Sequence, residues 1–254
     1  MDGIELPKNV DTIFENIDFT KTEDAVLFNR RITQLRDSMD LPAIFHKIDA
    51  EICPEKRRYS LNRRAPQPYG YYMPSEAMLV ATSNIQRGRL LKKAANPYCV
   101  YDYDASGKVV RIAHMHSYKH LLGKVSCFLY LLYNGHNVIM LTWNPKYQAK
   151  SLHPQYRYLF MLTLHIRDAN CNTRFISESS FTESLKTVAS DIEVYSEIID
   201  GKQTMDRYYL RTDPPSEGID IIATHFQIQY GEDNRMLESK VLKEEKLATK
   251  FPFR

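Results

Sequence analysis

The stretch "KVSCFLYLLYNGHNVIMLTW", residues 124–143, decides how this chain folds. In an extended strand its first half is apolar on both faces, with Val125, Cys127 and Leu129 on one and Phe128, Tyr130 and Leu132 on the other. Asn134-Gly135 then gives one of the strongest short-range signals for a β-hairpin. Because both faces must be covered, we expect this hairpin in the middle of a sheet.

Alternating apolar and polar residues with turn signals continue on both sides of this hairpin. Residues 98–114 predict a hairpin that turns at Asp104–Gly107, and residues 156–179 predict another. Residues 190–211 predict a fourth, turning at Asp200-Gly201, and residues 218–230 add one more strand. Neighbours in sequence usually pair in space, so these segments predict an antiparallel meander of about nine strands.

The N-terminal region has the spacing of helices. Thr20 and Glu23 have the spacing of a capping box, and Pro42 suits the first turn of a second helix. The apolar positions that recur at helical spacing are Phe28, Ile32, Leu35 and Met39, followed by Ile44, Phe45, Ile48 and Ile52. The predicted fold class is therefore α+β, a large antiparallel meander, as a curled sheet or open barrel, with N-terminal helices packed on it.

The chain divides into three regions of a single expected domain. Residues 1–55 are the N-terminal helical region, and residues 56–96 are a basic connector rich in Pro, Arg and Tyr, interpreted as a long loop or arm. Residues 97–254 form the sheet region, and the charged residues 237–250 at its end are expected to form a short helix.

One local resemblance concerns the first sheet hairpin. The letters "YDYDASGKVVRI", residues 101–112, resemble the tyrosine–aspartate repeat of bacterial Rhs-type proteins, whose units read Y-x-Y-D-x-x-G-x-hydrophobic. The match occurs once and covers a dozen residues. We interpret it as the turn chemistry of a hairpin.

Composition sets the expected environment. The 254 residues are enough for a sizeable core, and 17 tyrosines against 9 glycines favour a β-rich fold. The four cysteines are widely separated and form no CxxC pair, which indicates reduced thiols rather than a disulfide framework. Residues 1–10 do not have the pattern of a secretory signal, and no apolar run reaches about 18 residues. We expect a cytoplasmic protein without membrane contact.

Three of the eight histidines lie in "RIAHMHSYKH", residues 111–120. His114 and His116 would project from one face of a strand, and His120 could return from the following loop to complete a zinc site. Tyr118 occupies the place where such motifs usually carry an acid, so the simpler interpretation is the return strand of a hairpin. No cofactor other than this zinc ion is expected, and the distant helpers would be His136, His153 or His165.

Other catalytic patterns are missing from the sequence. It contains no G-x-S-x-G nucleophile motif and no Walker or dinucleotide-binding glycine pattern. We interpret Glu193 and Glu197 as the wet face of a strand rather than an acid/base pair.

Charge is distributed unevenly. Residues 1–55 carry a net charge of −6 and residues 56–93 carry +8, while the whole chain is only +3. Arginine and tyrosine interleave in the basic segment, and the candidate binding residues are Arg57, Arg58, Tyr59, Arg63, Arg64, Tyr69, Tyr71 and Tyr72. This mixture favours an acidic protein partner, since both types are enriched at interface hot spots. Single-stranded nucleic acid, which binds cations and stacking rings, is the alternative partner.

Three functions follow from these observations. The preferred hypothesis is a non-enzymatic protein-binding module, of the inhibitor or immunity type found in bacteria. The second is a nucleic-acid-binding protein that uses residues 56–93. The third is a metal-dependent enzyme built on His114, His116 and His120. The sequence leaves the oligomeric state open.

Overall fold

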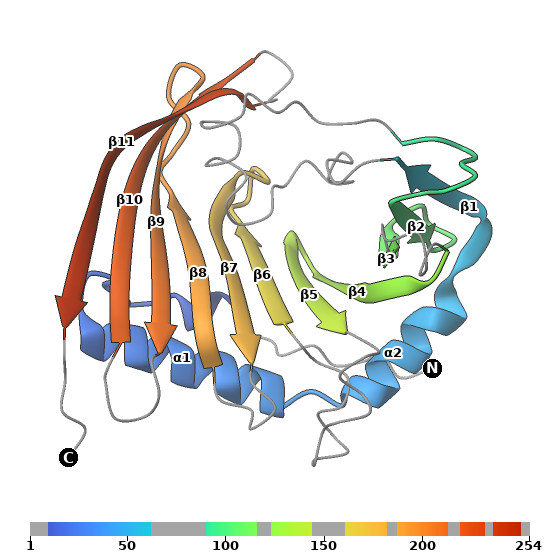
Figure 1. Cartoon of the computed structure of the whole chain (residues 1–254), viewed down its shortest axis with the longest axis horizontal. Helices are drawn as coiled ribbons and strands as arrows, with labels where there is room; N and C mark the ends of the chain where they lie inside the picture. Colours follow the sequence, from blue (N-terminus) through green and yellow to red (C-terminus); the bar gives the residue numbers. More distant parts are fainter. Residues whose placement is uncertain are drawn as a thin grey trace.

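Eleven antiparallel strands follow one another in a single curved sheet (Figure 1). Each strand pairs with its neighbours in sequence, in the order β1 to β11. The computed structural model describes residues 10–61, 90–115, 123–143, 161–181, 187–212, 219–231 and 236–249. Within these ranges β1 and β11 do not pair, so the sheet is curled but open.

The strands and helices have the following bounds. A 3-10 helix, Val10–Ile13, precedes the helices α1 (Thr22–Asp37) and α2 (Leu41–Glu51). The first six strands are β1 (Cys53–Ser60), β2 (Cys99–Tyr103), β3 (Val109–Met115), β4 (Val125–Asn134), β5 (Asn137–Trp143) and β6 (Met161–Arg167). The last five are β7 (Thr173–Phe181), β8 (Thr187–Tyr195), β9 (Lys202–Thr212), β10 (Ile219–Tyr230) and β11 (Met236–Thr249).

The predicted α+β meander with N-terminal helices is confirmed, but the sheet has eleven strands rather than nine. The two additional strands are its edges. β1 occupies residues expected to begin a loop, and β11 occupies residues 237–249, which were expected to be helical. Lys, Glu and Leu favour helices in isolation, but pairing with the long neighbouring strand β10 overrides that weak preference.

Both helices form where the apolar spacing predicts them. In α2, Pro42 lies in the first turn, and the Asp40 carboxylate caps the helix by accepting a hydrogen bond from the backbone of Ala43 (3.1 Å). The capping box expected at Thr20 is wrong, because α1 begins after Lys21 and the Thr20 hydroxyl donates to Asp18 instead (2.6 Å). No helix within the described ranges is long and apolar enough to cross a membrane.

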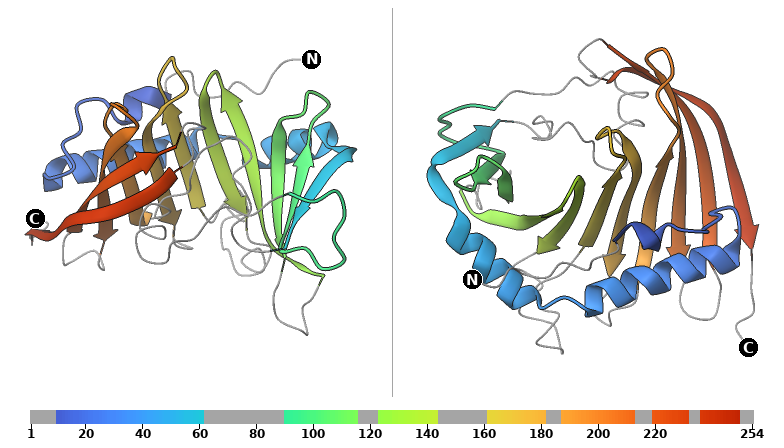
Figure 2. Two further views of the ribbon diagram at one scale, coloured as in Figure 1. Left: turned by 90° about the horizontal axis from the view of Figure 1, so that it is seen from above. Right: turned by 180° about the vertical axis from the view of Figure 1, so that it is seen from behind.

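The two helices pack on one face of the sheet (Figure 2). Phe28 and Ile32 of α1 are fully buried there, with Leu162 and Leu164 of β6 in the same core. Phe45 of α2 stacks on Tyr130 of β4, with ring centroids 4.3 Å apart. This core joins residues from the 3-10 helix to β10 and contains most of the buried hydrophobic residues that the structure describes.

The opposite side of the sheet, which we call the far face, carries a second core around the β4–β5 hairpin. Leu129 and Leu131 of β4 and Met140 of β5 lie in it, together with Tyr101 and Ile112 of β2 and β3. All five side chains are at least 95% buried. The predicted burial of the hairpin on both faces is therefore confirmed.

Two tight turns have the backbone geometry that their residues predict. Gly135 has φ 59° at the first central position of the β4–β5 turn, where glycine is favoured. Asp200 and Gly201 both have positive φ (50° and 70°) between Ile199 and Lys202, which exchange backbone hydrogen bonds. That pair of angles is the signature of a type I′ turn, the preferred two-residue link between antiparallel strands.

Removing the Phe45 ring tests the contact between α2 and the sheet. Phe45→Ala leaves a cavity beside Tyr130 and Trp143, and we expect it to lower the free energy of unfolding by about 3–5 kcal/mol. His46→Ala, at an exposed position of the same helix, is the control and should change it by less than about 0.5 kcal/mol. Equal effects in urea denaturation would contradict this packing.

Candidate functional site

The histidine segment is only partly covered by the structure. His114 lies near the end of β3, half-buried, paired in register with Cys99 and Cys127 and with its ring edge 6.0 Å from Tyr98. The hairpin interpretation of this strand is confirmed. His116 and His120 lie outside the described residues, so the zinc site stays a prediction. Among the side chains that the structure describes, no three His, Cys, Asp or Glu residues form a group that would hold a metal ion.

The three distant histidines have different environments. His165 is buried on β6, where its Nε2 atom is 2.9 Å from the Thr173 hydroxyl, and burial holds its pKa well below the usual value. His136, in the β4–β5 turn, lies 3.2 Å from the exposed thiol of Cys171. His153 lies outside the described residues.

The basic segment begins on the edge strand β1. Arg57, Arg58 and Tyr59 lie on this strand. The other candidate binding residues, Arg63, Arg64, Tyr69, Tyr71 and Tyr72, lie outside the described residues.

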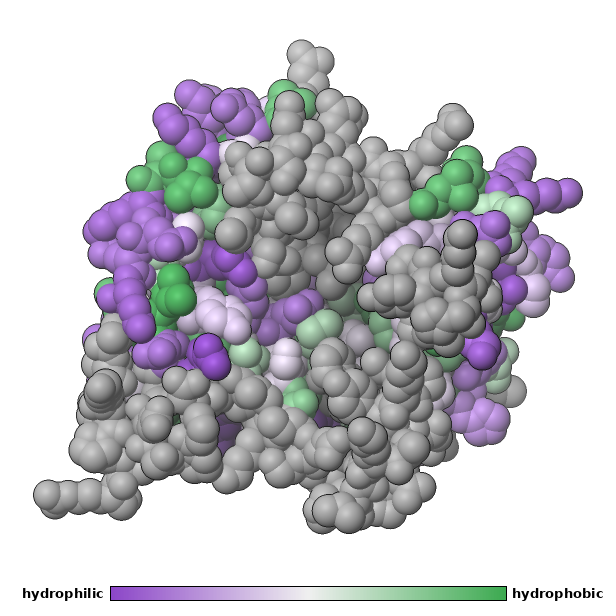
Figure 3. Space-filling model, viewed as in Figure 1, coloured by the Kyte–Doolittle hydropathy of each residue, from purple (hydrophilic) through white to green (hydrophobic). Residues whose placement is uncertain are grey.

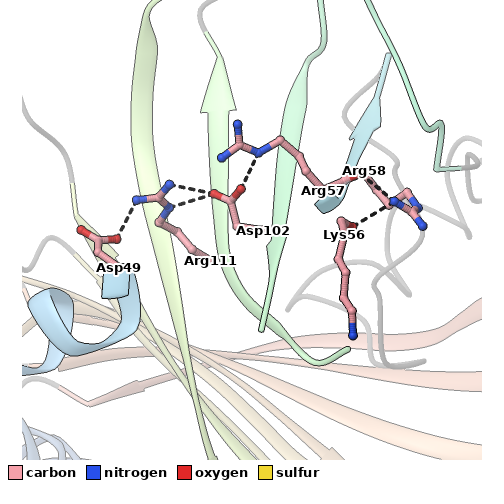
Figure 4. Close-up of polar contacts among 6 residues, drawn as sticks. All are labelled: Asp49, Lys56, Arg57, Arg58, Asp102 and Arg111. Atoms are coloured by element: carbon pink, nitrogen blue, oxygen red, sulfur yellow. Dashed lines mark hydrogen bonds and ion pairs between the residues drawn. The ribbon is translucent and has the colours of Figure 1, made fainter. Parts of the chain in front are cut away.

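Arg57 takes part in a chain of alternating charges (Figure 4). Its Nε atom donates to the Asp102 carboxylate of β2 (2.6 Å), which also accepts two hydrogen bonds from Arg111 of β3 (2.8 and 3.0 Å). Arg111 in turn donates to Asp49 of α2 (2.6 Å). Asp102 is 1% exposed, so the two guanidinium groups supply the counter-charge that its burial requires. The chain thereby connects α2 to three successive strands.

The two neighbouring basic residues are also engaged within the molecule. Arg58 donates from Nη1 to the backbone carbonyls of Lys56 (3.0 Å) and Arg57 (2.8 Å), as Figure 4 shows. The Lys56 ammonium group donates to the carbonyl of Ala105 in the β2–β3 turn. Lys56 therefore ties β1 to the β2–β3 turn, whereas the Arg58 contacts stay within β1.

A row of directly paired side chains crosses the far face through the middle of the sheet. We call it the central row. In register order from β4 to β10 it consists of Leu131, Met140, Thr163, Glu178, Asp191, Tyr209 and Ile222. The row begins apolar and becomes acidic at β7 and β8. Figure 3 looks onto this face and shows hydrophilic and hydrophobic residues side by side near its centre.

Two carboxylates stand opposite each other in the central row, an arrangement that destabilises a sheet. Asp191 is compensated, because Arg207 of β9 donates to both of its oxygens, from Nε at 2.8 Å and from Nη2. Glu178 accepts no hydrogen bond from any residue in the described ranges. Burial and the adjacent Asp191 carboxylate raise the pKa of Glu178 to about 7, while Arg207 opposes that rise. Glu178 can therefore bind a cation or gain a proton near neutral pH.

Glu193 lies one row away on β8 and is buried. It is 0% exposed and its carboxylate accepts a hydrogen bond from the Tyr195 hydroxyl (2.5 Å). The interpretation of this residue as part of a wet strand face is wrong, whereas Glu197 is indeed exposed. Sequence reasoning thus missed Glu178, Asp191 and Arg207. The sequence does show charged residues at alternate positions of these strands. It does not show the strand register, and only the register makes these residues neighbours.

The second edge strand, β11, presents apolar side chains to solvent. Leu237, Val241 and Leu242 are 57%, 41% and 55% exposed. Leu237 and Leu242 are each the additional residue of a β-bulge, because the pairing with β10 skips one position of β11 at each of them.

No protein-family model matches this chain, and no curated protein is similar enough in sequence to count as a relative.

The Asp102 chain can be tested by removing its central carboxylate. Asp102→Ala removes the buried acceptor that Arg57 and Arg111 share and leaves Arg111 with Asp49 alone, so we expect the free energy of unfolding to fall by about 3–5 kcal/mol. Arg57→Ala removes a side chain that is 34% exposed and should cost roughly half as much or less. Chemical denaturation measures both, and a loss below about 1 kcal/mol for Asp102→Ala would contradict the role given to this residue.

Glu178 should make stability depend on pH. Between the ordinary pKa of 4.5 and the folded value of about 7, the folded chain keeps a proton that the unfolded chain has lost. Stability from this group is therefore present at low pH and is lost as the pH rises through 7. Glu178→Gln cannot ionise, so from pH 5 to pH 8 its stability relative to wild type should increase by about 2 kcal/mol.

The matched control for this experiment is Glu244→Gln, at an exposed position of β11. Its difference from wild type should not change between pH 5 and pH 8. Free energies of unfolding measured in urea at several pH values decide the matter, and a difference for Glu178→Gln that is constant with pH would refute the assignment.

Proposed function

We propose that this chain is a non-enzymatic protein-binding module whose partner docks on the β11 edge. The observation that carries the proposal is the gathering of exposed apolar side chains at this edge. In the described ranges five large hydrophobic residues are exposed, and Leu237, Val241 and Leu242 of β11 are three of them. Solvent-exposed leucines grouped in this way are typical of interaction surfaces.

A fourth exposed residue lies at the same end of the sheet. Ile199 precedes the β8–β9 turn, and Gly201 in that turn accepts a backbone hydrogen bond from Tyr230 at the end of β10 (2.8 Å). β11 begins at Met236, which pairs with Tyr230. The exposed apolar residues are therefore spread from the middle of β11 towards this turn. On the left of Figure 3, where β11 lies, hydrophobic residues stand among hydrophilic ones.

The bulges favour recognition through side chains. A regular edge strand offers unpaired backbone groups that can pair with another strand, and bulges interrupt that pattern. Here each bulge also places a leucine at the edge, and the two leucines are five residues apart, about 17 Å along a strand. They suit a partner with two apolar pockets at that spacing.

Charges around the leucines supply the polar rim that interfaces require. β11 carries three lysines and three glutamates, namely Lys240, Lys243, Lys246, Glu238, Glu244 and Glu245. We therefore propose that apolar anchoring dominates the affinity and that the charges set the orientation. An acidic partner for the basic segment stays a proposal, since most of that segment lies outside the described residues. Binding through a fixed surface is also what an inhibitor or immunity-type role needs.

Site-specific photo-crosslinking tests the proposal. A benzophenone amino acid at position 242 is compared with one at Leu61, which is equally exposed but follows the opposite edge strand β1. In extract from cells that encode the chain, we expect one protein to be cross-linked from position 242 and not from position 61. Leu237→Ser with Leu242→Ser should reduce recovery of that protein at least tenfold with little loss of stability, because both leucines are exposed.

Two results would overturn the proposal. One is equal cross-linking from positions 61 and 242, which would mean that the β11 edge has no special affinity. The other is a cross-link from position 242 to a second copy of the chain alone, which would assign the edge to self-association.

A further inference from the structure

We propose that the far face of the sheet binds a primary alkylammonium group, held by Glu178 and Thr163 of the central row. This inference goes beyond protein binding at β11, and it rests on different residues in a different part of the sheet.

The first argument is an unmatched negative charge. Glu178 and Asp191 are direct neighbours on β7 and β8. Arg207 makes a bidentate contact with Asp191, donating to both of its carboxylate oxygens. Glu178 therefore lies beside a like charge without a hydrogen-bond donor among the described residues. A partly buried carboxylate in this position costs stability unless something else supplies a counter-charge. A bound cation would supply it.

The second argument is a pair of buried hydroxyl groups without partners. Thr163 stands directly opposite Glu178, is 2% exposed, and its Oγ1 atom has no hydrogen-bond partner within the described ranges. The same holds for Thr142 on β5, which is 4% exposed and lies diagonally beside Thr163. Buried polar atoms are nearly always hydrogen-bonded, so unpaired ones beside a carboxylate indicate a missing ligand.

The acceptor oxygens of Glu178 and the two threonines determine which kind of cation fits. An ammonium group has three N–H donors and no acceptor, which matches a carboxylate and nearby hydroxyl oxygens. A guanidinium group prefers a carboxylate that it can contact with two parallel hydrogen bonds, and Arg207 already occupies that position on Asp191. The central row continues from Thr163 into Met140 and Leu131, so the side of the site away from Asp191 is apolar, which favours an ammonium group that carries an alkyl chain.

Binding should depend on pH in one direction. The charged or titratable groups around Glu178 are Asp191 and Arg207, with Tyr209 next to Asp191 in the central row. His165 and Glu193 lie one row away on one side, and Arg211 lies one row away on the other. Because the pKa of Glu178 is raised to about 7, the free site is mostly protonated at pH 5.5 and ionised at pH 8. An ammonium ligand requires the ionised form, so affinity should increase about thirtyfold between these values.

Titration with butylammonium chloride, followed by NMR of the threonine methyl groups at pH 8, tests the proposal. We expect saturable shifts at Thr163 in the full chain. Glu178→Gln should weaken binding at least tenfold, and Thr163→Val, which keeps the side-chain shape, should weaken it three- to tenfold. Glu244→Gln on β11 is the matched control and should bind like wild type.

Further ligands separate the sources of the amine and the type of contact. The natural ligand could be a lysine side chain or a free polyamine, and comparing the affinities of Nα-acetyl-lysine amide and spermidine distinguishes the two. Tighter binding of either one supports the site. Tetramethylammonium, which has a charge but no N–H donor, should bind at least tenfold more weakly. Equal binding of tetramethylammonium, wild-type affinity in Glu178→Gln, or no saturation by 50 mM butylammonium would each overturn the proposal. None of these results affects cross-linking at β11.

Discussion

The β4–β5 hairpin must bury both of its faces, and the rest of the chain is arranged around that requirement. Tyr130 and Ile139 point to the side that α1 and α2 cover, while Leu131 and Met140 point to the other. A flat sheet with helices on one side would leave the second set in water. Instead β1 to β3 curl around the far face, where Tyr101 and Ile112 cover it.

This curl explains why the ion pairs concentrate at the β1 end. A strongly bent edge brings α2, β3, β2 and β1 close together, and the Asp102 carboxylate is buried among them. Its two arginine partners fix the orientation of these four elements. The basic charge that marks the sequence at Arg57 is thus, in the described part, a structural counter-charge to a buried aspartate.

The central elements of this fold can be predicted from the sequence because their signals are local. The Asn134-Gly135 and Asp200-Gly201 turns and the spacing of Phe28 and Ile32 each depend on a few adjacent residues. The edge strands cannot be predicted in this way. β11 is exposed on much of its surface, so it lacks the apolar alternation that marks a strand, and only its pairing with β10 makes it one.

The candidate ligand residues were missed for a related reason. Glu178, Asp191 and Arg207 come from three strands, and each is an ordinary charged residue in its own segment. Strand register makes them neighbours, and register depends on bulges and turn lengths along the whole meander. The far face therefore has an apolar core around β4–β5 and a charged row at β7–β9, beside a second apolar cluster that includes Ile176, Tyr195 and Met205. Only the assembled sheet reveals this arrangement.

Native-state hydrogen exchange tests most directly whether the two-sided hairpin organises the fold. If it does, the backbone amides of Leu131, Ile139 and Met140 exchange only when the whole chain unfolds, while amides of β1 and β11 exchange earlier through local opening. The free energies of exchange for the hairpin should then equal the global free energy of unfolding. Hairpin amides that exchange as readily as those of β11 would contradict the account.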